Sequence, residues 1–416
     1  MNDTEVKTVK TKEEEMMMIY RSFQMNLDSL KSFVDTLSPV AFEKDSNQAE
    51  EVTIIIKNAF TQIGIEIPED GKIDKESGVT MDKEQLFFFA KQLRKIPKIS
   101  VGHSRILYQS SFVLLVGYFE YLFADLLKFY YKHYPGNISD KPIQVIINEL
   151  KSYDTVEDAV DYVISKEVEM ILFDLTFNEL IDFFNKQLKI NLESNLLNWS
   201  LINETRERRH IIVHNNAIIN KKYLKKSKTD FLPDKDDLKI GEKISVHKDY
   251  FYLAFNEIYA TGHLLIFNCW RQWIKSDTKK IYGEIMNTSF ECLKQDLNNI
   301  ARCISLYSTT IEAKSDEELD YLLRAKFNYL IALKQLEKND ELETQLSQMK
   351  VSTLSPIFKM AYYALKEEKE KLLETIPHCK LVDKMKIEWV HEWPLFKHIR
   401  KDKEFIQQIE EKFNAK

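Results

Sequence analysis

The sequence predicts an all-α protein, and two observations carry this prediction. Only 9 glycines and 9 prolines occur among the 416 residues, so the residue types that end helices are scarce. Apolar residues recur at spacings of three and four over long stretches, which places them on one face of a helix. Because no stretch alternates apolar and polar residues as a half-buried strand does, we expect helices throughout.

The N-terminal part of the chain is predicted to be a short lead-in followed by helices. Residues 1–15 are polar and charged, lack the apolar core of a signal peptide, and are expected to be disordered. Residues 16–99 are expected to form a helical accessory region. Its predicted helices are 16–37, closed by Ser38-Pro39; 50–65; and, after a polar loop over 68–78, 82–95 with Asp82 as N-cap.

Residues 100–275 are predicted to form a second domain. Its first helix is apolar almost all round, which indicates deep burial, and Pro135-Gly136-Asn137 ends it. A polar, lysine-rich segment over 220–240 precedes a strongly aromatic last helix. The predicted helices are 104–134, 140–151, 155–165, 167–189, 195–213 and 248–274.

Residues 276–416 are predicted to form a C-terminal helical domain. Ser315 and Glu318 have the spacing of a capping box at one helix start. Successive helices of this length resemble a helical-hairpin array such as tetratricopeptide repeats, and a plain bundle is the alternative. The predicted helices are 279–312, 316–338, 339–349, 355–367, 369–375 and 402–414.

Composition limits the classes of function. The formal net charge of −6 shows that the chain is no polycation, so contact with nucleic acid requires a local basic patch. The four cysteines are scattered, which argues against a disulfide framework and fits a reducing cytoplasm. The most apolar run, 112–127, carries Glu120 and Asp125 and is too short to span a membrane comfortably. We expect a cytoplasmic protein without membrane contact and without a cofactor or bound metal.

The stretch Thr205-Arg-Glu-Arg-Arg-His-Ile-Ile-Val-His-Asn-Asn216 concentrates the chemistry of the chain. Arg209 can hold phosphate charge, and His214 can move protons near neutral pH. On one ideal helix a step of five residues leaves these side chains about 140° apart. Either the helix ends near Val213 and the Asn215-Asn216 turn redirects His214, or two chains contribute to one site about a twofold axis.

A basic surface is predicted beside this pair. From Arg206 to Lys228 there are eight basic residues and one acid, Glu207, so 8 − 1 gives a local charge of +7. Such a patch attracts phosphate backbones, although a lysine run is equally typical of a solvated loop. Tyr223 lies within it and is a candidate for stacking on a base. The predicted RNA-binding residues are Arg206, Arg208, Lys221, Lys222, Tyr223, Lys225 and Lys226.

These residue types suit cleavage of RNA without a metal. The ribose 2′-OH attacks the neighbouring phosphate when one group removes its proton and another protonates the leaving oxygen. His214 is the candidate acid/base, and Arg209 would stabilise the charge of the transition state. His210 or Asn215 would orient the histidine or the phosphate.

The motif Arg209-His-Ile-Ile-Val-His214 resembles the Arg-polar-x-x-x-His signature of HEPN-domain ribonucleases. The flank His214-Asn-Asn-Ala-Ile-Ile-Asn-Lys-Lys-Tyr223 is similar to the family's Val-His-Asn-Asn-Gly-x-Ile/Val-Asn…Tyr. The helix around Glu120 resembles the family's first helix, and 239–274 its last. The resemblance covers roughly residues 100–275.

The resemblance implies a dimerising helical bundle with a metal-independent RNase site at the dimer interface, and roles in phage defence or toxin–antitoxin systems. It assigns Arg209 and His214 as the catalytic pair and puts His210 in the polar slot. Two positions depart from the pattern, because that slot is usually Asn and the Gly after Asn-Asn is Ala217 here.

Two other functions remain open from the sequence. The first is a non-catalytic HEPN-like adaptor that binds RNA, a nucleotide or a protein. The second is a helical scaffold that binds a protein partner or antitoxin through residues 280–416. His214 is alternatively a helix-end residue bonded to a carbonyl group. His103, His133, His247 and His263 lack the spacing of metal ligands and are interpreted as structural, and a metal site around His378 and around His391 with Glu388 and Glu392 is the lesser alternative to packing of the last helices. The aromatic stripe from Tyr250 to Tyr259 is interpreted as core.

Overall fold

The computed structural model describes residues 10–64, 80–94, 101–137, 147–150, 153–190, 196–227, 232 and 235–414. The all-α prediction is confirmed, because the secondary structure of these residues is helical apart from one isolated antiparallel bridge between Ile218 and Lys243. Among the described helices, none is both long enough and apolar enough to cross a lipid bilayer. The predicted lead-in, up to Val9, and the polar loop over 68–78 lie outside the described residues. The last part of the lead-in was predicted wrongly as disordered, because α1 already begins at Lys12.

The first helix corrects the prediction at Ser38-Pro39. Helix α1 runs without interruption from Lys12 to Gln62 and contains Pro39, so the two predicted helices are one. A proline inside a helix removes a backbone hydrogen bond and costs about 3 kcal/mol. Residues on both sides of it, Val34 and Ala41, are buried with the same heptad spacing. Continued burial of this face offsets the local cost.

Helices α2, Lys83–Leu93, and α3, His103–His133, lie close to their predicted bounds. Asp82 is the N-cap of α2, as predicted, and the structure adds a reciprocal capping box with Gln85. Asp45 of α1 caps α3, since its carboxylate accepts from the backbone N–H groups of His103 at 2.6 Å and Ser104 at 3.0 Å. Burial raises the pKa of Asp45, but the hydrogen bonds from Ser104 and His103 outweigh it and lower the pKa to about 2.

The chain divides into two compact units that interleave along the sequence. The first comprises Met1–Gln24, Tyr118–Thr205 and Leu253–Lys416, and the second comprises Met25–Gly117 and Arg206–Tyr252. These bounds do not coincide with the domain boundaries predicted at residues 99 and 275. Helices α1, α3, α7 (Trp199–His214) and α9 (Lys248–Trp273) each contribute residues to both units.

In the first unit, the start of α1 packs closely on the middle of α9. A Cβ atom at Gly262 would lie 2.1 Å from Cζ of Phe23, so only glycine allows this contact. The buried ring of His263 lies among Tyr20, Phe23 and Tyr259, with centroid distances of 5.7, 5.4 and 4.4 Å. The predicted structural role of His263 is therefore confirmed.

Two helices of the first unit cover the second half of α3. Helix α5 spans Val156–Asp174 and α6 spans Phe177–Lys186, so the predicted break near residue 166 lies instead near 175. Phe123 of α3 makes edge-to-face ring contacts with Phe177 and Phe184 at centroid distances of 6.2 and 5.3 Å. Of the helix predicted over 140–151, the structure describes α4, Ile147–Leu150.

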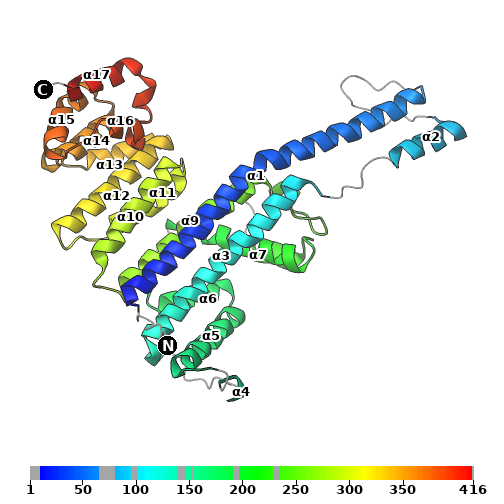
Figure 1. Cartoon of the computed structure of the whole chain (residues 1–416), viewed down its shortest axis with the longest axis horizontal. Coiled ribbons are helices and arrows are strands. Elements are labelled where there is room, and N and C mark those ends of the chain that lie inside the picture. The colour runs from blue at the N-terminus through cyan, green and yellow to red at the C-terminus, as the bar shows by residue number, and fades with distance from the viewer. Residues whose placement is uncertain are drawn as a thin grey trace, which may run out of the picture. The chain divides into compact units, whose positions relative to one another are not determined.

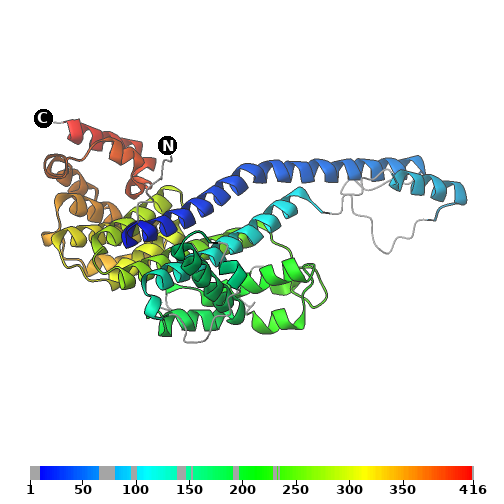
Figure 2. The ribbon, with the colours of Figure 1, turned by 60° about the horizontal axis from the view of Figure 1, so that its bottom comes forward.

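The C-terminal helices form three consecutive hairpins, yellow-green to orange in Figure 1 and Figure 2. Their helices are α10 (Thr278–Lys294) with α11 (Asn298–Tyr307), α12 (Asp316–Gln335) with α13 (Asn339–Ser347), and α14 (Pro356–Lys366) with α15 (Lys369–Val382). Helix α12 packs on α10, α11, α13 and α14. Short helices α16 (Glu388–Glu392) and α17 (Lys403–Asn414) follow. The helix predicted over 279–312 is therefore two helices.

The three hairpins share one turn. Asp296, Glu337 and Glu367 each adopt a left-handed φ, of 59°, 56° and 60°. The next residue donates its N–H to the carbonyl five positions earlier in all three, at 2.9, 3.0 and 3.0 Å. This is the Schellman ending of a helix, in which glycine is the usual left-handed residue. Acidic residues occupy the position of this glycine, so no recurring glycine marks the three turns in the sequence.

Candidate functional site

Helix α7, Trp199–His214, carries the Arg/His motif in its second half, within the second unit. His214 is its last residue, and the next N–H, of Asn215, still donates to the carbonyl of Ile211 at 2.9 Å. The side chain of His214 therefore keeps its helical direction. The suggestion that the turn redirects His214 toward Arg209 is wrong for this chain.

The candidate catalytic residues point in different directions around the axis of α7. His210 and His214 are exposed, and Arg209 is half-buried. The helical repeat places His210 about 100° from Arg209, and His214 about 140° from it. Val213 lies between Arg209 and the two histidines and is 45% exposed. One chain thus offers a cation on one edge of this surface and two imidazoles on the other.

The two histidines contact one another. They are four residues apart, and their ring centroids lie 4.9 Å from each other. Burial lowers the pKa of His210 below its ordinary value, the charges of His214, Lys222 and Lys226 add to this effect, and Glu207 opposes it. His210 is therefore neutral at pH 7 and able to accept a proton.

The turn after α7 is fixed by local hydrogen bonds. The side-chain amide of Asn215 donates to the carbonyl of Ile218 at 2.7 Å, so Asn215 shapes the turn rather than orienting His214. Asn216 and Ala217 both have left-handed φ values, of 49° and 61°. Ala217 accepts from the N–H of Ile244 at 2.8 Å. Ala217 thus has the backbone conformation that glycine favours.

Helix α8, Lys221–Lys226, supplies the basic surface. Asn220 is the N-cap of α8, since its side-chain oxygen accepts from the N–H of Tyr223 at 2.9 Å. This role was not predicted, although asparagine is a favoured N-cap residue. The exposed lysines of α8 are Lys221, Lys222, Lys225 and Lys226. Lys226 forms an ion pair with Glu207 at 3.0 Å. Arg206 is half-buried, and Lys228 lies outside the described residues.

Two residues of the predicted RNA-binding set are buried, which corrects their assignment. The Arg208 side chain is fully buried, with its guanidinium 3.5 Å from the ring centroid of Tyr250 and a hydrogen bond of 3.1 Å to the carbonyl of Ser245. Tyr223 is only 1% exposed, so its ring has no free face for a base. Both side chains stabilise the fold around α7 and α8 instead.

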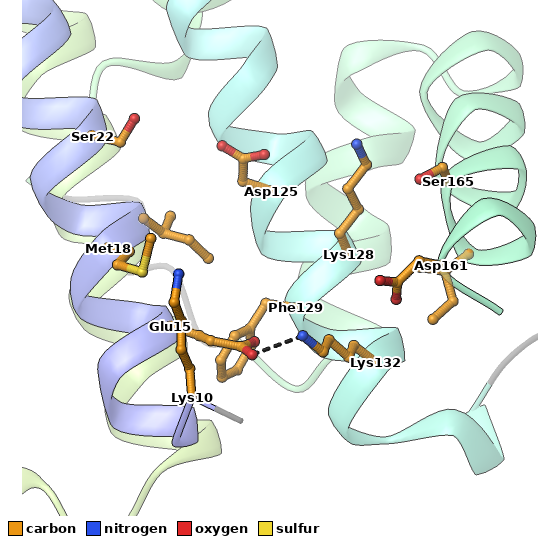
Figure 3. A pocket seen from close by; sticks show the side chains of 12 residues that line it. Lys10, Glu15, Met18, Ser22, Asp125, Lys128, Phe129, Lys132, Asp161 and Ser165 are labelled. Atoms are coloured by element: carbon orange, nitrogen blue, oxygen red, sulfur yellow. Dashed lines mark hydrogen bonds and ion pairs between the residues drawn. The ribbon is translucent and has the colours of Figure 1, made fainter. Parts of the chain in front are cut away.

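A separate hollow of about 490 Å³ lies between α1, α3 and α5 in the first unit (Figure 3). Glu15 and Lys132, which form an ion pair at 2.7 Å, lie at one end. Asp125 and Lys128 of α3 and Asp161 of α5 also line it. Acidic and basic side chains are equally represented in this lining, so its field favours no single sign of charge, and none of the predicted site residues lines it.

The described residues contain no group of three or more His, Cys, Asp or Glu side chains placed to hold a metal ion. The aromatic stripe that begins at Tyr250 is core as predicted, with Phe251 and Phe255 fully buried, whereas Tyr252 is half-buried. Nε2 of His391 lies 3.3 Å from Oε1 of Glu410, an acid on α17.

Comparison with known proteins gives no relative: no family model, no curated protein and no solved structure matches this chain. The described residues define an all-α protein in which helix α7 carries the half-buried Arg209 beside two exposed histidines, His210 and His214.

Proposed function

We propose that the protein is a metal-independent endoribonuclease whose site forms from the α7 surfaces of two chains. Attack of the ribose 2′-OH on the phosphorus breaks the P–O5′ bond and leaves a 2′,3′-cyclic phosphate and a 5′-OH. One imidazole takes the 2′-OH proton, and a protonated imidazole gives a proton to the 5′ oxygen. Arg209 stabilises the charge that develops on the phosphoryl oxygens.

The observation that carries this proposal is the contact between His210 and His214 beside Arg209. A proton donor and a proton acceptor are needed for the transfer, and two imidazoles 4.9 Å apart supply both types of group. The exposed lysines of α8 add a positive surface for the RNA backbone. The resemblance to HEPN ribonucleases supports the same residues, with His210 in place of the usual asparagine.

A shared site follows from the angle between Arg209 and His214. They project about 140° apart on a regular helix, so one α7 does not direct both at one phosphate. A twofold axis near Val213 would place Arg209 of one chain opposite the histidines of its partner. Val213 is 45% exposed, so this point of α7 is accessible to a second chain. The scattered cysteines suit a reducing cytoplasm, and the resemblance to HEPN ribonucleases implies a role in phage defence or in a toxin–antitoxin system.

The test is cleavage of structured and single-stranded RNA in EDTA by the purified full-length chain. We expect products with 2′,3′-cyclic phosphate ends. Arg209→Ala and His214→Ala should each lower the rate by about 10²-fold or more without loss of helicity. His378→Ala, which removes an exposed histidine of α15, is the control and should leave the rate unchanged. Intact RNA with every folded variant would exclude the proposal for those substrates.

The oligomer is tested separately by sedimentation. Val213→Asp should convert a dimer into monomers and abolish cleavage, because it introduces charge at the proposed axis. Val382→Asp, at a similarly exposed valine of α15, should leave both unchanged. Cleavage by a monomeric Val213→Asp protein would contradict the shared site.

The alternative is a non-catalytic adaptor that binds RNA through the same basic surface. The exposure of Lys221, Lys222 and Lys225 supports binding without requiring chemistry. In that case RNA binds with a strong salt dependence, and Arg209→Ala and His214→Ala leave the cellular phenotype intact.

A further inference from the structure

We infer that His210 and His214 form a binding site for a divalent transition-metal ion, and that the ion acts on this surface as an inhibitor rather than as a cofactor. Binding itself is independent of the proposed function, whereas the inhibition rests on it. The site needs no rearrangement of the backbone, because both side chains project from the same face of α7 and both are exposed.

The spacing of the two rings fits chelation. Histidines four apart on a helix present their rings to one ion on one face. A metal about 2.1 Å beyond each ring nitrogen lies about 3.2 Å from each ring centroid. With the angle between the two ligands at about 90° to 109°, the two ring centroids are then about 4.5 to 5.2 Å apart. The observed separation of 4.9 Å lies within this interval.

The ligand type selects the ion. Imidazole nitrogen suits Zn²⁺, Ni²⁺ and Cu²⁺, whereas Mg²⁺ and Ca²⁺ prefer oxygen. Two protein ligands leave the remaining positions to water, consistent with the lack of any third ligand among the described residues. For such a pair, affinity should follow the order Cu²⁺ above Ni²⁺ and Zn²⁺.

The charges around the pair set its strength. Lys222 and Lys226 act on His210 and repel a metal ion, and Glu207 attracts one. Because Lys226 is paired with Glu207 at 3.0 Å, these two charges largely offset each other. Lys222 remains, so the site binds a metal more weakly than a closed structural site and releases it to a chelator.

A bound ion would block the proposed chemistry. Coordination occupies the nitrogen lone pair with which each imidazole accepts a proton, so a metallated pair neither takes the 2′-OH proton nor protonates the 5′ oxygen. The ion would therefore hold the nuclease inactive until it is removed.

The experiment is isothermal titration of the full-length, untagged chain with NiCl₂, ZnCl₂ and MgCl₂. We expect one Ni²⁺ or Zn²⁺ per chain and no response to Mg²⁺. His210→Asn and His214→Asn should each weaken Ni²⁺ binding at least tenfold, whereas His378→Asn, at an exposed histidine of α15, should bind as the wild type does. Circular dichroism confirms that each variant is folded.

Equal Ni²⁺ affinity of the wild type and both motif variants would overturn the site, as would the absence of binding to a folded wild type. A parallel measurement follows RNA cleavage by the wild type with NiCl₂ and after EDTA. Cleavage that stops with NiCl₂ and returns with EDTA supports inhibition, and cleavage unaffected by saturating NiCl₂ overturns it. If no RNA is cleaved under any condition, the proposed function fails while the titration still decides the metal site.

Discussion

The guanidinium of Arg208 lies 3.5 Å from the ring centroid of Tyr250 and is fully buried, while the neighbouring Arg209 remains half-exposed. Two adjacent arginines therefore have different tasks. Arg208 connects α7 to the start of α9 through its contacts with Ser245 and Tyr250. Arg209 belongs to the surface that carries His210 and His214.

The first prediction follows from this division. Arg208→Ala should lower the free energy of unfolding by about 2 to 3 kcal/mol, because it removes the contact with Tyr250 and the hydrogen bond to Ser245. Arg209→Ala should lower stability by less than Arg208→Ala does, because its side chain is only half-buried, and should act mainly on RNA cleavage. Urea unfolding of both variants checks the difference. Equal stabilities for the two would contradict the assigned roles.

A second prediction concerns acid stability. Burial lowers the pKa of His263 to about 4, partly opposed by its hydrogen bond to the carbonyl of Tyr259. The folded state keeps this ring neutral, whereas the unfolded chain binds a proton below about pH 6.5, so stability is complete above that pH and falls between about pH 6.5 and 4. The loss should reach about 3 kcal/mol, at about 1.4 kcal/mol per pKa unit.

His263→Phe keeps an aromatic ring without the titrating group and should remove most of this slope. Unfolding in denaturant at pH 7, 6 and 5 measures it, with His378→Asn as an exposed control. Parallel pH profiles for the wild type and His263→Phe would refute the assignment.

A third prediction tests the close approach of α1 to α9. Gly262→Ala should destabilise by about 1 to 3 kcal/mol, because the new methyl group overlaps the ring of Phe23. Gly117→Ala in α3 meets nothing within 4 Å and should stabilise by about 0.5 to 1 kcal/mol, since alanine favours the helix. Phe23→Leu should restore part of the loss in the Gly262→Ala background. Thermal unfolding reports all of these changes, and an unchanged Gly262→Ala protein would disprove the contact.

A fourth prediction concerns the shared hairpin turn. Glu337 is exposed and has a φ of 56°, which strains any residue with a Cβ atom. Glu337→Gly should therefore stabilise by about 0.5 to 1 kcal/mol. Glu337→Ala removes the same carboxylate but keeps the strain, so it should be close to neutral. If alanine stabilises as much as glycine, the gain comes from the lost charge and not from the backbone.

Local sequence patterns predicted most of the C-terminal helices. Apolar spacing and caps such as Ser315, which accepts from the N–H of Glu318 at 3.2 Å, located most helices correctly. The second hydrogen bond of the predicted capping box was predicted wrongly. The Glu318 carboxylate accepts from the N–H of Lys314, and not from that of the N-cap residue Ser315. The break between α10 and α11 was not predicted. Its left-handed residue is Asp296 and not the glycine that usually marks the end of a helix.

By itself, the sequence determined the helical class, the caps at Asp82 and Ser315, and the concentration of Arg209, His210 and His214 in one short segment. These are properties of residues close together in the chain, and they follow from local spacing and hydrogen bonding. Tertiary structure alone decided that Arg208 and Tyr223 are buried and that α1 continues through Pro39. Those outcomes depend on partners such as Tyr250, about 40 residues away, and no local pattern shows which face of a helix such partners will cover.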